Sequence, residues 1–339
     1  MILEVFYYLC RPINYNNMTL EFILLAAGLG LILLGANWLV DGASSIAKKT
    51  GMSEFIIGLT IVGIGTSTPE MVVSFISSIQ GKTDMAIGNI VGSNIFNTFV
   101  ILGITALICP LAITKSSLKR DLPLNILVTG LLILLGLKAT IFGFGSDSLT
   151  RVDALIMLAI LALYFRLLLK KPKNGIQEGE TESDENTKVF TTGKSILLII
   201  IGLAGLVFGG RLFVNSATEI AHYYKMSEKF IALTIMAAGT SLPELATSVV
   251  AALKGRGQLA LGNVLGSNIS NILLILGGSA LIHPLSFGSM TPVDLGAVMV
   301  GAIFMMTSAY TFKTYKLDRF EAVILLLLEG GYMTYLFMN

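Results

Sequence analysis

The sequence is poor in charge and in the residues that build most enzyme and metal sites. Only 13% of its 339 residues are charged, and it has two cysteines, two histidines and one tryptophan. A soluble domain carries about 25% charged residues, so an ordinary water-soluble enzyme is excluded. A net charge of +2 provides no basic surface for nucleic acid. Two cysteines cannot make a disulfide framework, and two histidines cannot form a histidine-rich metal site.

Apolar residues are in excess, because they make up 54% of the chain and the mean hydropathy is +0.80. A membrane-spanning helix needs about 20 mostly apolar residues. Runs of this kind predict an all-α polytopic membrane protein with ten transmembrane helices. The predicted spans are 20–46, 54–80, 85–109, 122–140, 150–170, 194–220, 229–253, 259–282, 292–312 and 319–338.

The distribution of basic residues predicts the orientation. If the N-terminus faces outside, 16 of the 23 Lys and Arg residues fall on the inner side. The positive-inside rule then predicts a plasma-membrane protein with both termini extracellular and the 171–193 loop cytoplasmic. That acidic loop indicates a solvated linker rather than a cation-sensing segment, since it lacks EF-hand spacing. Residues 1–17 resemble neither a signal peptide nor a span, and the true start is either Met1 or Met18.

The chain repeats itself with an offset of 174 residues. MSEFIIGLTIVGIGTSTPE at 52–70 matches MSEKFIALTIMAAGTSLPE at 226–244, and AIGNIVGSNIFN at 86–97 matches ALGNVLGSNISN at 260–271. Each copy contains five predicted spans, an odd number, so the copies enter the membrane from opposite sides. We expect an extension at 1–17, a five-helix repeat at 18–170, the linker at 171–193 and an inverted five-helix repeat at 194–339. Inverted repeats are typical of secondary transporters with a substrate site near the bilayer midplane.

Two acidic residues, Glu70 and Glu244, occupy equivalent positions deep in the second and seventh spans. An acidic side chain at that depth costs roughly 2.5–3.5 kcal/mol on insertion scales, so a matched pair indicates a function. The structural alternative is a protonated glutamate that hydrogen-bonds neighbouring helices together.

The sequence around each glutamate predicts that helices 2 and 7 are broken within the membrane. Pro69 and Pro243 lack an amide hydrogen and clash with the carbonyl four residues earlier, which frees the carbonyls of Gly65 and Gly239. Free carbonyls are tolerated in a bilayer only where they line a cavity or meet a ligand. A simple helix kink is the alternative. The same stretches add four hydroxyl oxygens, those of Thr66, Ser67, Thr240 and Ser241.

The second repeated motif, Gly-Ser-Asn-Ile-x-Asn, supplies further oxygens from the third and eighth spans. Its Ser and final Asn lie four residues apart and so share one helix face. These residues are Ser93, Asn97, Ser267 and Asn271. The alternative is helix packing through the neighbouring glycines, and we assign Asn94 and Asn268 to packing or backbone hydrogen bonds. A site made only of oxygens selects hard cations such as Ca²⁺, and the same oxygens can hold Na⁺ or protons.

GTSTPE with GSNIFN, and GTSLPE with GSNISN, resemble the signature of the cation/calcium antiporter superfamily. Within it the chain looks most like the prokaryotic sodium/calcium exchangers. The resemblance implies a monomeric, non-enzymatic antiporter in the lipid bilayer that extrudes Ca²⁺ as Na⁺ enters, by alternating access and without a cofactor. It implies that Glu70 and Glu244 are shared ligands, and it adds the carbonyls of Gly63 and Ala237.

Two features of the motifs bear on ion coupling. Asn271 stands where some members of the superfamily carry aspartate, which argues against K⁺ cotransport. The main alternative is a Ca²⁺/H⁺ antiporter, although the Gly-Asn-x-x-Glu-His type signature of the proton-coupled branch is absent. A cation channel and an intramembrane enzyme are weaker alternatives, because inverted broken repeats predict saturable exchange and no H-E-x-x-H motif is present.

Overall fold

The structure is a computed structural model, and it describes residues 18–143, 145–168, 189–226, 237–288, 290–311 and 315–338. Most of these residues are helical. Some sequence-based expectations lie outside the described residues: the extension at 1–17, most of the 171–193 linker, and residues 229–236 of the seventh predicted span.

Helices occupy the described part of every predicted span. In the first half they are α2 (Met18–Thr50), α3 (Glu54–Ile57), α4 (Gly63–Thr66), α5 (Thr68–Ile79), α6 (Thr83–Phe96), α7 (Leu102–Ile108), α8 (Leu122–Gly136), α9 (Lys138–Phe142) and α10 (Arg151–Leu168). In the second half they are α11 (Thr192–Tyr223), α13 (Ala237–Thr240), α14 (Leu242–Leu253), α15 (Gly257–Ser270), α16 (Gly277–Ile282), α17 (Pro292–Thr307) and α18 (Arg319–Met338). Wider π-helical turns interrupt them at η1 (Gly58–Val62), η2 (Asn97–Ile101), η3 (Ser117–Asp121) and η5 (Asn271–Leu276).

Side chains at the helix ends satisfy backbone groups that the helices leave unpaired. Thr291 and Asp294 form a reciprocal capping box at the start of α17, which bonds two otherwise orphaned amides. Asp147 accepts hydrogen bonds of 2.8 and 3.0 Å from backbone amides at the start of α9. The hydroxyl of Thr140 and these amides stabilise the ionised carboxylate and lower the pKa of Asp147.

By length and composition, four helical stretches of the described chain could cross a membrane. They are Met18–Thr50, Thr83–Ile108, Thr192–Tyr223 and Gly257–Ile282. A fifth stretch, Glu54–Thr66 followed by Thr68–Ile79, passes the same test as a pair bent by 47°. Leu242–Leu253 and Pro292–Thr307 are shorter apolar helices. These helices support a membrane protein with several spans, while the number of ten stays a prediction.

Two short antiparallel strand pairs join the halves of the chain. Strand β1 (Leu111–Ala112) pairs with β4 (Lys316–Leu317), and β2 (Ser148–Leu149) pairs with β3 (Leu285–Ser286). Leu111 lies opposite Leu317, and Leu149 lies opposite Leu285. Leu111 and Leu285 are separated by the 174-residue offset of the sequence repeat, so equivalent positions in the two halves each pair with a strand of the other half.

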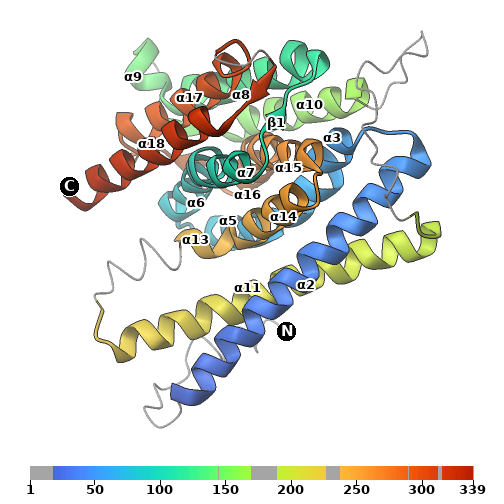
Figure 1. Ribbon diagram of the computed structural model, residues 1–339. Helices are drawn as coiled ribbons and strands as arrows, with labels where there is room; N and C mark the ends of the chain where they lie inside the picture. The colour runs from blue at the N-terminus through green and yellow to red at the C-terminus, as the bar shows by residue number, and fades with distance from the viewer. Residues whose placement is uncertain are drawn as a thin grey trace.

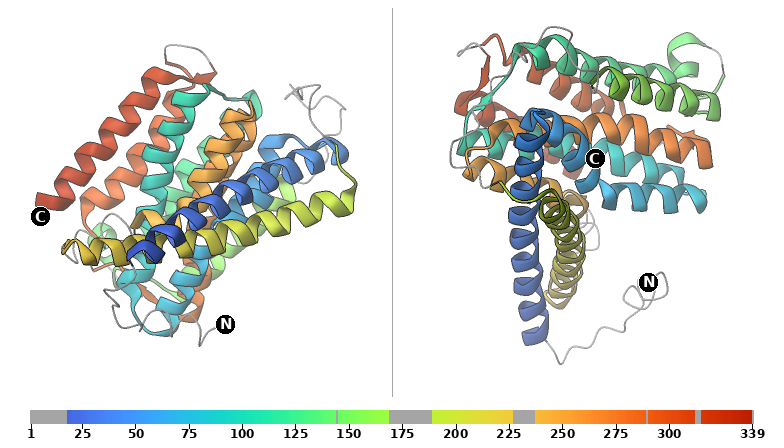
Figure 2. Two further views of the ribbon diagram at one scale, coloured as in Figure 1. Left: turned by 60° about the horizontal axis from the view of Figure 1, so that its bottom comes forward. Right: turned by 90° about the vertical axis from the view of Figure 1, so that its right-hand side faces the viewer.

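The helices lie in layers, with α2 and α11 side by side along one face of the molecule (Figure 1). Helices α5, α6, α7, α14, α15 and α16 form the middle, and α8, α10, α17 and α18 cover the opposite side. Figure 2 shows α2 and α11 in contact from two further directions. Glycines allow this close crossing: a Cβ on Gly35 would lie 2.7 Å from the Gly202 carbonyl oxygen, and one on Gly28 would lie 2.9 Å from that of Gly209.

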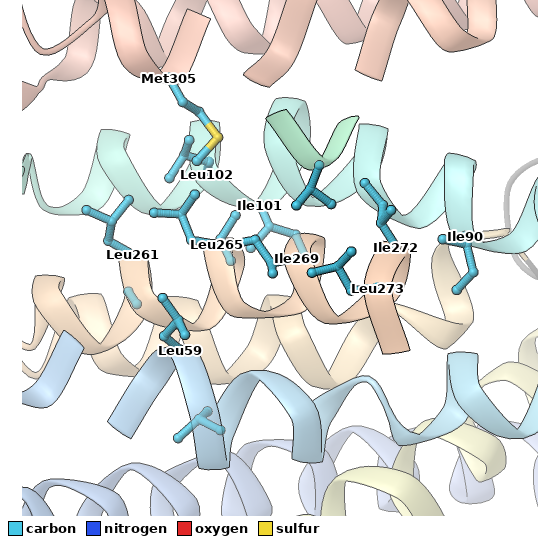
Figure 3. Close-up of a cluster of buried hydrophobic side chains, with 14 of the residues drawn as sticks. Leu59, Ile90, Ile101, Leu102, Leu261, Leu265, Ile269, Ile272, Leu273 and Met305 are labelled. Atoms are coloured by element: carbon cyan, nitrogen blue, oxygen red, sulfur yellow. The ribbon is translucent and has the colours of Figure 1, made fainter. Parts of the chain in front are cut away.

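The stretch from α15 to α16 runs through the centre of the molecule. In its apolar window 94% of the residues are buried, against 33% for α2 and 28% for α11. Figure 3 shows part of this core, in which Leu265 and Ile269 of α15 share a buried cluster with Leu102 of α7. Leucine and isoleucine side chains such as Leu33 and Ile200 are exposed on α2 and α11. The two long helices therefore present an apolar outer surface, as lipid-facing helices do.

Candidate functional site

The helical backbone breaks at the same place in both halves. Ser67 separates α4 from α5 with φ −76° and ψ 12°, and Ser241 separates α13 from α14 with φ −90° and ψ 8°. A proline follows at the start of α5 and of α14, where its missing amide hydrogen is tolerated. The two Thr-Ser pairs therefore sit at helix interruptions, and a glutamate lies in the first turn of each following helix.

Protein donors already bond the carbonyls near the first break. The hydroxyl of Thr68 donates a 2.7 Å hydrogen bond to the Gly65 carbonyl, the group that Pro69 releases. The Gly63 carbonyl accepts from the hydroxyl of Ser267 at 3.2 Å and from the amide of Ser67 at 3.3 Å. Gly63 is thus brought to the second half of the chain, and its counterpart Ala237 begins α13.

The two glutamates are connected to each other's helix break. The Ser67 hydroxyl donates to Oε1 of Glu244 at 2.8 Å, and the Ser241 hydroxyl donates to Oε1 of Glu70 at 3.1 Å. Both glutamates are only 1% exposed. Each serine lies three residues before the glutamate of its own half and bonds the glutamate of the other half. The two bonds therefore bring both acidic residues into one buried cluster.

Two pairs of asparagines form a second set of contacts that cross between the halves. Nδ2 of Asn271 donates to Oδ1 of Asn94 at 2.9 Å, and Nδ2 of Asn97 donates to Oδ1 of Asn268 at 3.2 Å. Asn97 and Asn271 each begin a π-helical turn, an irregularity that is frequent at functional sites. The amide nitrogens of Asn97 and Asn271 are therefore bonded to other asparagines, and their amide oxygens are the groups that could bind a ligand.

Four oxygens of this cluster are buried without a hydrogen-bond donor among the described residues. They are Oε2 of Glu70, Oε2 of Glu244, Oδ1 of Asn97 and Oδ1 of Asn271. Leaving such a group unbonded costs about 1–3 kcal/mol, so buried oxygens of this kind normally meet a partner. These oxygens accept hydrogen bonds and have no hydrogen to donate, so a cation is a suitable partner for them.

The remaining predicted residues surround this cluster. Ser267 of α15 donates to the Gly63 carbonyl at 3.2 Å, and Thr66 and Thr240 are the residues directly before the two helix breaks. Thr66 also donates to the carbonyl of Val62 at 3.0 Å. Ser93 is buried on α6, one turn before the position of Asn97. The predicted side chains thus lie at the two helix breaks or on α5, α6, α14 and α15 and the π-helical turns η2 and η5.

Two asparagines that the sequence analysis did not single out anchor the glutamate backbones. Nδ2 of Asn89 donates to the Glu70 carbonyl at 3.2 Å, and Nδ2 of Asn263 donates to the Glu244 carbonyl at 3.3 Å. Oδ1 of Asn263 lies 3.1 Å from the hydroxyl oxygen of Thr66 and shares its single hydrogen with the Val62 carbonyl. The available signal was the Gly-Asn pair that recurs in both copies of the second motif.

Within the described chain no group of three or more His, Cys, Asp or Glu residues could hold a metal ion, so any cation here needs neutral oxygens beside the two carboxylates.

Known proteins resemble this chain over most of its length. The family described as sodium/calcium exchanger protein matches residues 20–170 and 194–338. The sodium/calcium exchanger MaX1 of Methanosarcina acetivorans is 34% identical over 354 residues, covering 94% of this chain and 99% of MaX1. The inner membrane protein YrbG of Escherichia coli is 36% identical over 273 residues, covering 79% of this chain and 81% of YrbG.

A solved structure of the sodium-calcium exchanger NCX_Mj, soaked with 10 mM Na⁺ and zero Ca²⁺, has the same overall fold. Its TM-score is 0.79 at 31% identity, and the match covers 94% of this chain and 99% of the NCX_Mj chain. The family match, the sequence relatives and the shared architecture agree with the paired motifs that hold Glu70 and Glu244. The chain belongs to the sodium/calcium exchanger protein family.

Proposed function

We propose that this protein is a secondary active antiporter that exchanges Na⁺ for Ca²⁺ by alternating access and extrudes Ca²⁺. The observation that carries the proposal is the set of four buried oxygens, on Glu70, Glu244, Asn97 and Asn271, that have no hydrogen-bond donor among the described residues. MaX1 and NCX_Mj are both named as sodium/calcium exchangers, which supports the choice of ions.

The chemistry of the donor set favours Ca²⁺ and Na⁺. Ca²⁺ takes 6–8 oxygen ligands at about 2.3–2.6 Å, and two carboxylates balance its charge. Carboxylate, hydroxyl and amide oxygens surround the Glu70–Glu244 cluster without a thiolate or an imidazole. Na⁺ uses the same kinds of oxygen, so the two ions compete, and competition at a site that opens alternately to each side is sufficient for exchange.

Some ligands need a smaller rearrangement than others. The four oxygens without a donor among the described residues can bind an ion without losing a hydrogen bond. The Gly63 carbonyl oxygen would instead bind an ion beside the Ser267 and Ser67 donors that already bond it. Ser67 and Ser241 donate to glutamates through their hydrogens, which leaves lone pairs on their oxygens for an ion. The proposed ligand set is Glu70, Glu244, Thr66, Ser67, Thr240, Ser241, Ser93, Asn97, Ser267, Asn271 and the carbonyls of Gly63 and Ala237.

The proposal includes ten spans in two inverted repeats, 18–170 and 194–339, with broken helices at Ser67 and Ser241 near the bilayer midplane. Reciprocal contacts between the halves support a two-fold relation: the paired strands, the α2–α11 glycines and the crossed serine–glutamate bonds. We place both termini outside the cell, the 171–193 linker in the cytoplasm and a monomer in the plasma membrane. Residues 1–17 form an extension before the first repeat.

In this mechanism α2 and α11 move together over the buried helices. Their close glycine contacts make them one unit, and their low burial compared with α15 allows movement against lipid. Ca²⁺ binds between Glu70 and Glu244 from the cytoplasm and leaves on the outside when Na⁺ displaces it. A site without an ion would keep two carboxylates in an apolar setting, which is costly, so its reorientation is disfavoured and the two ion movements are coupled.

Calcium uptake into vesicles tests this function. Purified protein in liposomes loaded with Na⁺ is diluted into Na⁺-free buffer that contains radioactive Ca²⁺, beside liposomes that carry only a proton gradient. We expect saturable uptake with the Na⁺ gradient, which monensin abolishes by dissipating that gradient. Uptake driven by the proton gradient alone would make the protein a Ca²⁺/H⁺ antiporter, and no gradient-dependent uptake would refute exchange altogether.

A further inference from the structure

The orientation of the Asn271 amide is determined by Asn94. Asn94 uses Nδ2 to bond the backbone carbonyl of Asn268 at 3.2 Å, and a backbone carbonyl can only accept. Its Oδ1 must therefore face Asn271, and it accepts from Nδ2 of Asn271 at 2.9 Å. An Asn271 amide turned by 180° would set two acceptor oxygens against each other. This arrangement leaves Oδ1 of Asn271 without a donor among the described residues.

The same relation holds in the other half with a weaker restraint. Oδ1 of Asn268 accepts from Nδ2 of Asn97 at 3.2 Å, and Nδ2 of Asn268 donates to the hydroxyl of Thr98 at 2.9 Å. A hydroxyl can donate as well as accept, so Thr98 restrains Asn268 less strictly than a carbonyl restrains Asn94. The residue equivalent to Thr98 in the second copy is Ile272, so this contact has no counterpart there.

Burial gives these hydrogen bonds their importance. Asn94, Asn97, Asn268 and Asn271 are at most 3% exposed, so water does not compete for their amide groups. An asparagine presents a partial negative charge through its oxygen and a partial positive charge through its NH₂ group. The direction in which the amide faces therefore decides whether it attracts or repels a cation.

We propose that Asn94 and Asn268 are positioning residues, which hold the amides of Asn271 and Asn97 so that oxygen and not nitrogen is available to the transported cation. This role rests on the proposed function, in which Asn97 and Asn271 are ligands. Asn94 and Asn268 act through hydrogen bonds that cross between the halves, so each half orients a ligand of the other. Each copy of the Gly-Ser-Asn-Ile-x-Asn motif thus contains one proposed ligand and one residue that orients the ligand in the other copy.

A double-mutant comparison separates positioning from packing. Asn94→Leu keeps the approximate size of the side chain and removes its acceptor, so Asn271 can turn over. Aspartate at position 271 has two equivalent oxygens and cannot present nitrogen. We expect Asn94→Leu to raise the Ca²⁺ dissociation constant about tenfold in the native background, the equivalent of one neutral hydrogen bond, and less than about twofold in the Asn271→Asp background.

The measurement is equilibrium binding of radioactive Ca²⁺ to purified full-length protein in detergent, with the elution profile on gel filtration as the check on folding. Asn125→Leu is the matched control, because Asn125 is a buried asparagine of α8 outside the motifs, and its Oδ1 has no partner in the part of the chain that the structure describes. The Ca²⁺ affinity of this variant should stay unchanged. Asn268→Leu with Asn97→Asp repeats the comparison in the other half if Asn94→Leu fails to fold. We expect a smaller loss there, because Thr98 restrains Asn268 less.

The outcomes distinguish this role from the function on which it rests. Equal losses in the native and aspartate backgrounds would assign Asn94 to packing and overturn the positioning role. An unchanged affinity of Asn94→Leu in the native background would overturn it as well. Wild-type protein that binds neither Ca²⁺ nor Na⁺ would overturn the proposed function, and the positioning role with it.

Discussion

The hydroxyl of Ser67 donates a 2.8 Å hydrogen bond to Glu244, a residue 177 positions away in the sequence. The reciprocal bond from Ser241 to Glu70 makes this contact part of a two-fold pattern. Each glutamate is consequently stabilised by the half of the chain that does not contain it. The site therefore exists only where the two halves meet, and a change in either half should alter ion binding by both.

Removal of one serine hydroxyl should weaken Ca²⁺ binding without unfolding the protein. Ser67→Ala deletes a hydrogen bond to a buried carboxylate, an interaction worth about 1.5–3 kcal/mol, and it also deletes a proposed ligand oxygen. We expect half-saturation of Ca²⁺ uptake to require about tenfold to a hundredfold more Ca²⁺. Ser78→Ala is the control on α5, the helix that follows Ser67, because among the described residues the Ser78 hydroxyl bonds only the carbonyl of Ser74. Equal effects of the two variants would argue against a role for Ser67 at the site.

The crossing of α2 and α11 predicts that the same substitution has different effects on stability at two glycines. A Cβ on Gly35 would meet the backbone of α11, whereas one on Gly30 would meet nothing within 4 Å. Gly35→Ala should destabilise the protein by about 1–3 kcal/mol through overpacking. Gly30→Ala should be neutral or stabilise it by up to about 1 kcal/mol, because alanine favours helix. Thermal unfolding followed by circular dichroism measures both, and a stable Gly35→Ala variant would contradict the close crossing.

An ion pair between Lys254 and Asp41 should depend on the conformation of the transporter. Nζ of Lys254 lies 2.6 Å from Oδ1 of Asp41 and joins the end of α14 to α2. Both side chains are partly exposed, so the pair contributes at most about 1 kcal/mol. If α2 slides past α14, Asp41→Asn should change the ratio of half-saturating Ca²⁺ on the two sides of the membrane by up to about fivefold.

Vesicles of known orientation give that ratio. The exchanged pair, Asp41→Lys with Lys254→Asp, should restore it toward the native value, because the attraction is the same in either direction. A ratio that stays at the native value in Asp41→Asn would show that this ion pair does not distinguish the conformations.

Hydropathy predicts the positions of the helices well, because long apolar runs have few other structures in a bilayer. The contacts between helices are harder to predict. The two-residue strand pairs, such as Leu111 with Leu317, are too short to produce an alternating pattern. The glycines of α2 and α11 indicate close packing in general, but only the three-dimensional arrangement shows that Gly35 meets Gly202.

For the site, duplication of the motifs pointed to Glu70 and Glu244, and the structure brings their surroundings together. The sequence could not predict which hydroxyl bonds which glutamate, since that depends on how the halves cross. It also gave Asn89 and Asn263 no role, because an asparagine beside a glycine in a span fits ordinary helix packing equally well. The orientation of the Asn271 amide depends on the direction of its hydrogen bond to Asn94. That direction follows from the folded arrangement of the cluster and cannot be predicted from the sequence.

The most direct test of the central claim is equilibrium Ca²⁺ binding to purified protein with single glutamate substitutions. Glu70→Gln and Glu244→Gln remove one charged ligand each and should weaken binding about a hundredfold or more, from the loss of at least about 2.7 kcal/mol. Glu329→Gln is the matched control, because Glu329 of α18 is also buried, has one oxygen without a partner among the described residues and lies outside the repeated motifs. We predict that Glu329→Gln binds Ca²⁺ as the native protein does and that Na⁺ displaces this Ca²⁺. Native affinity in both Glu70→Gln and Glu244→Gln would contradict a shared cation site between these two residues.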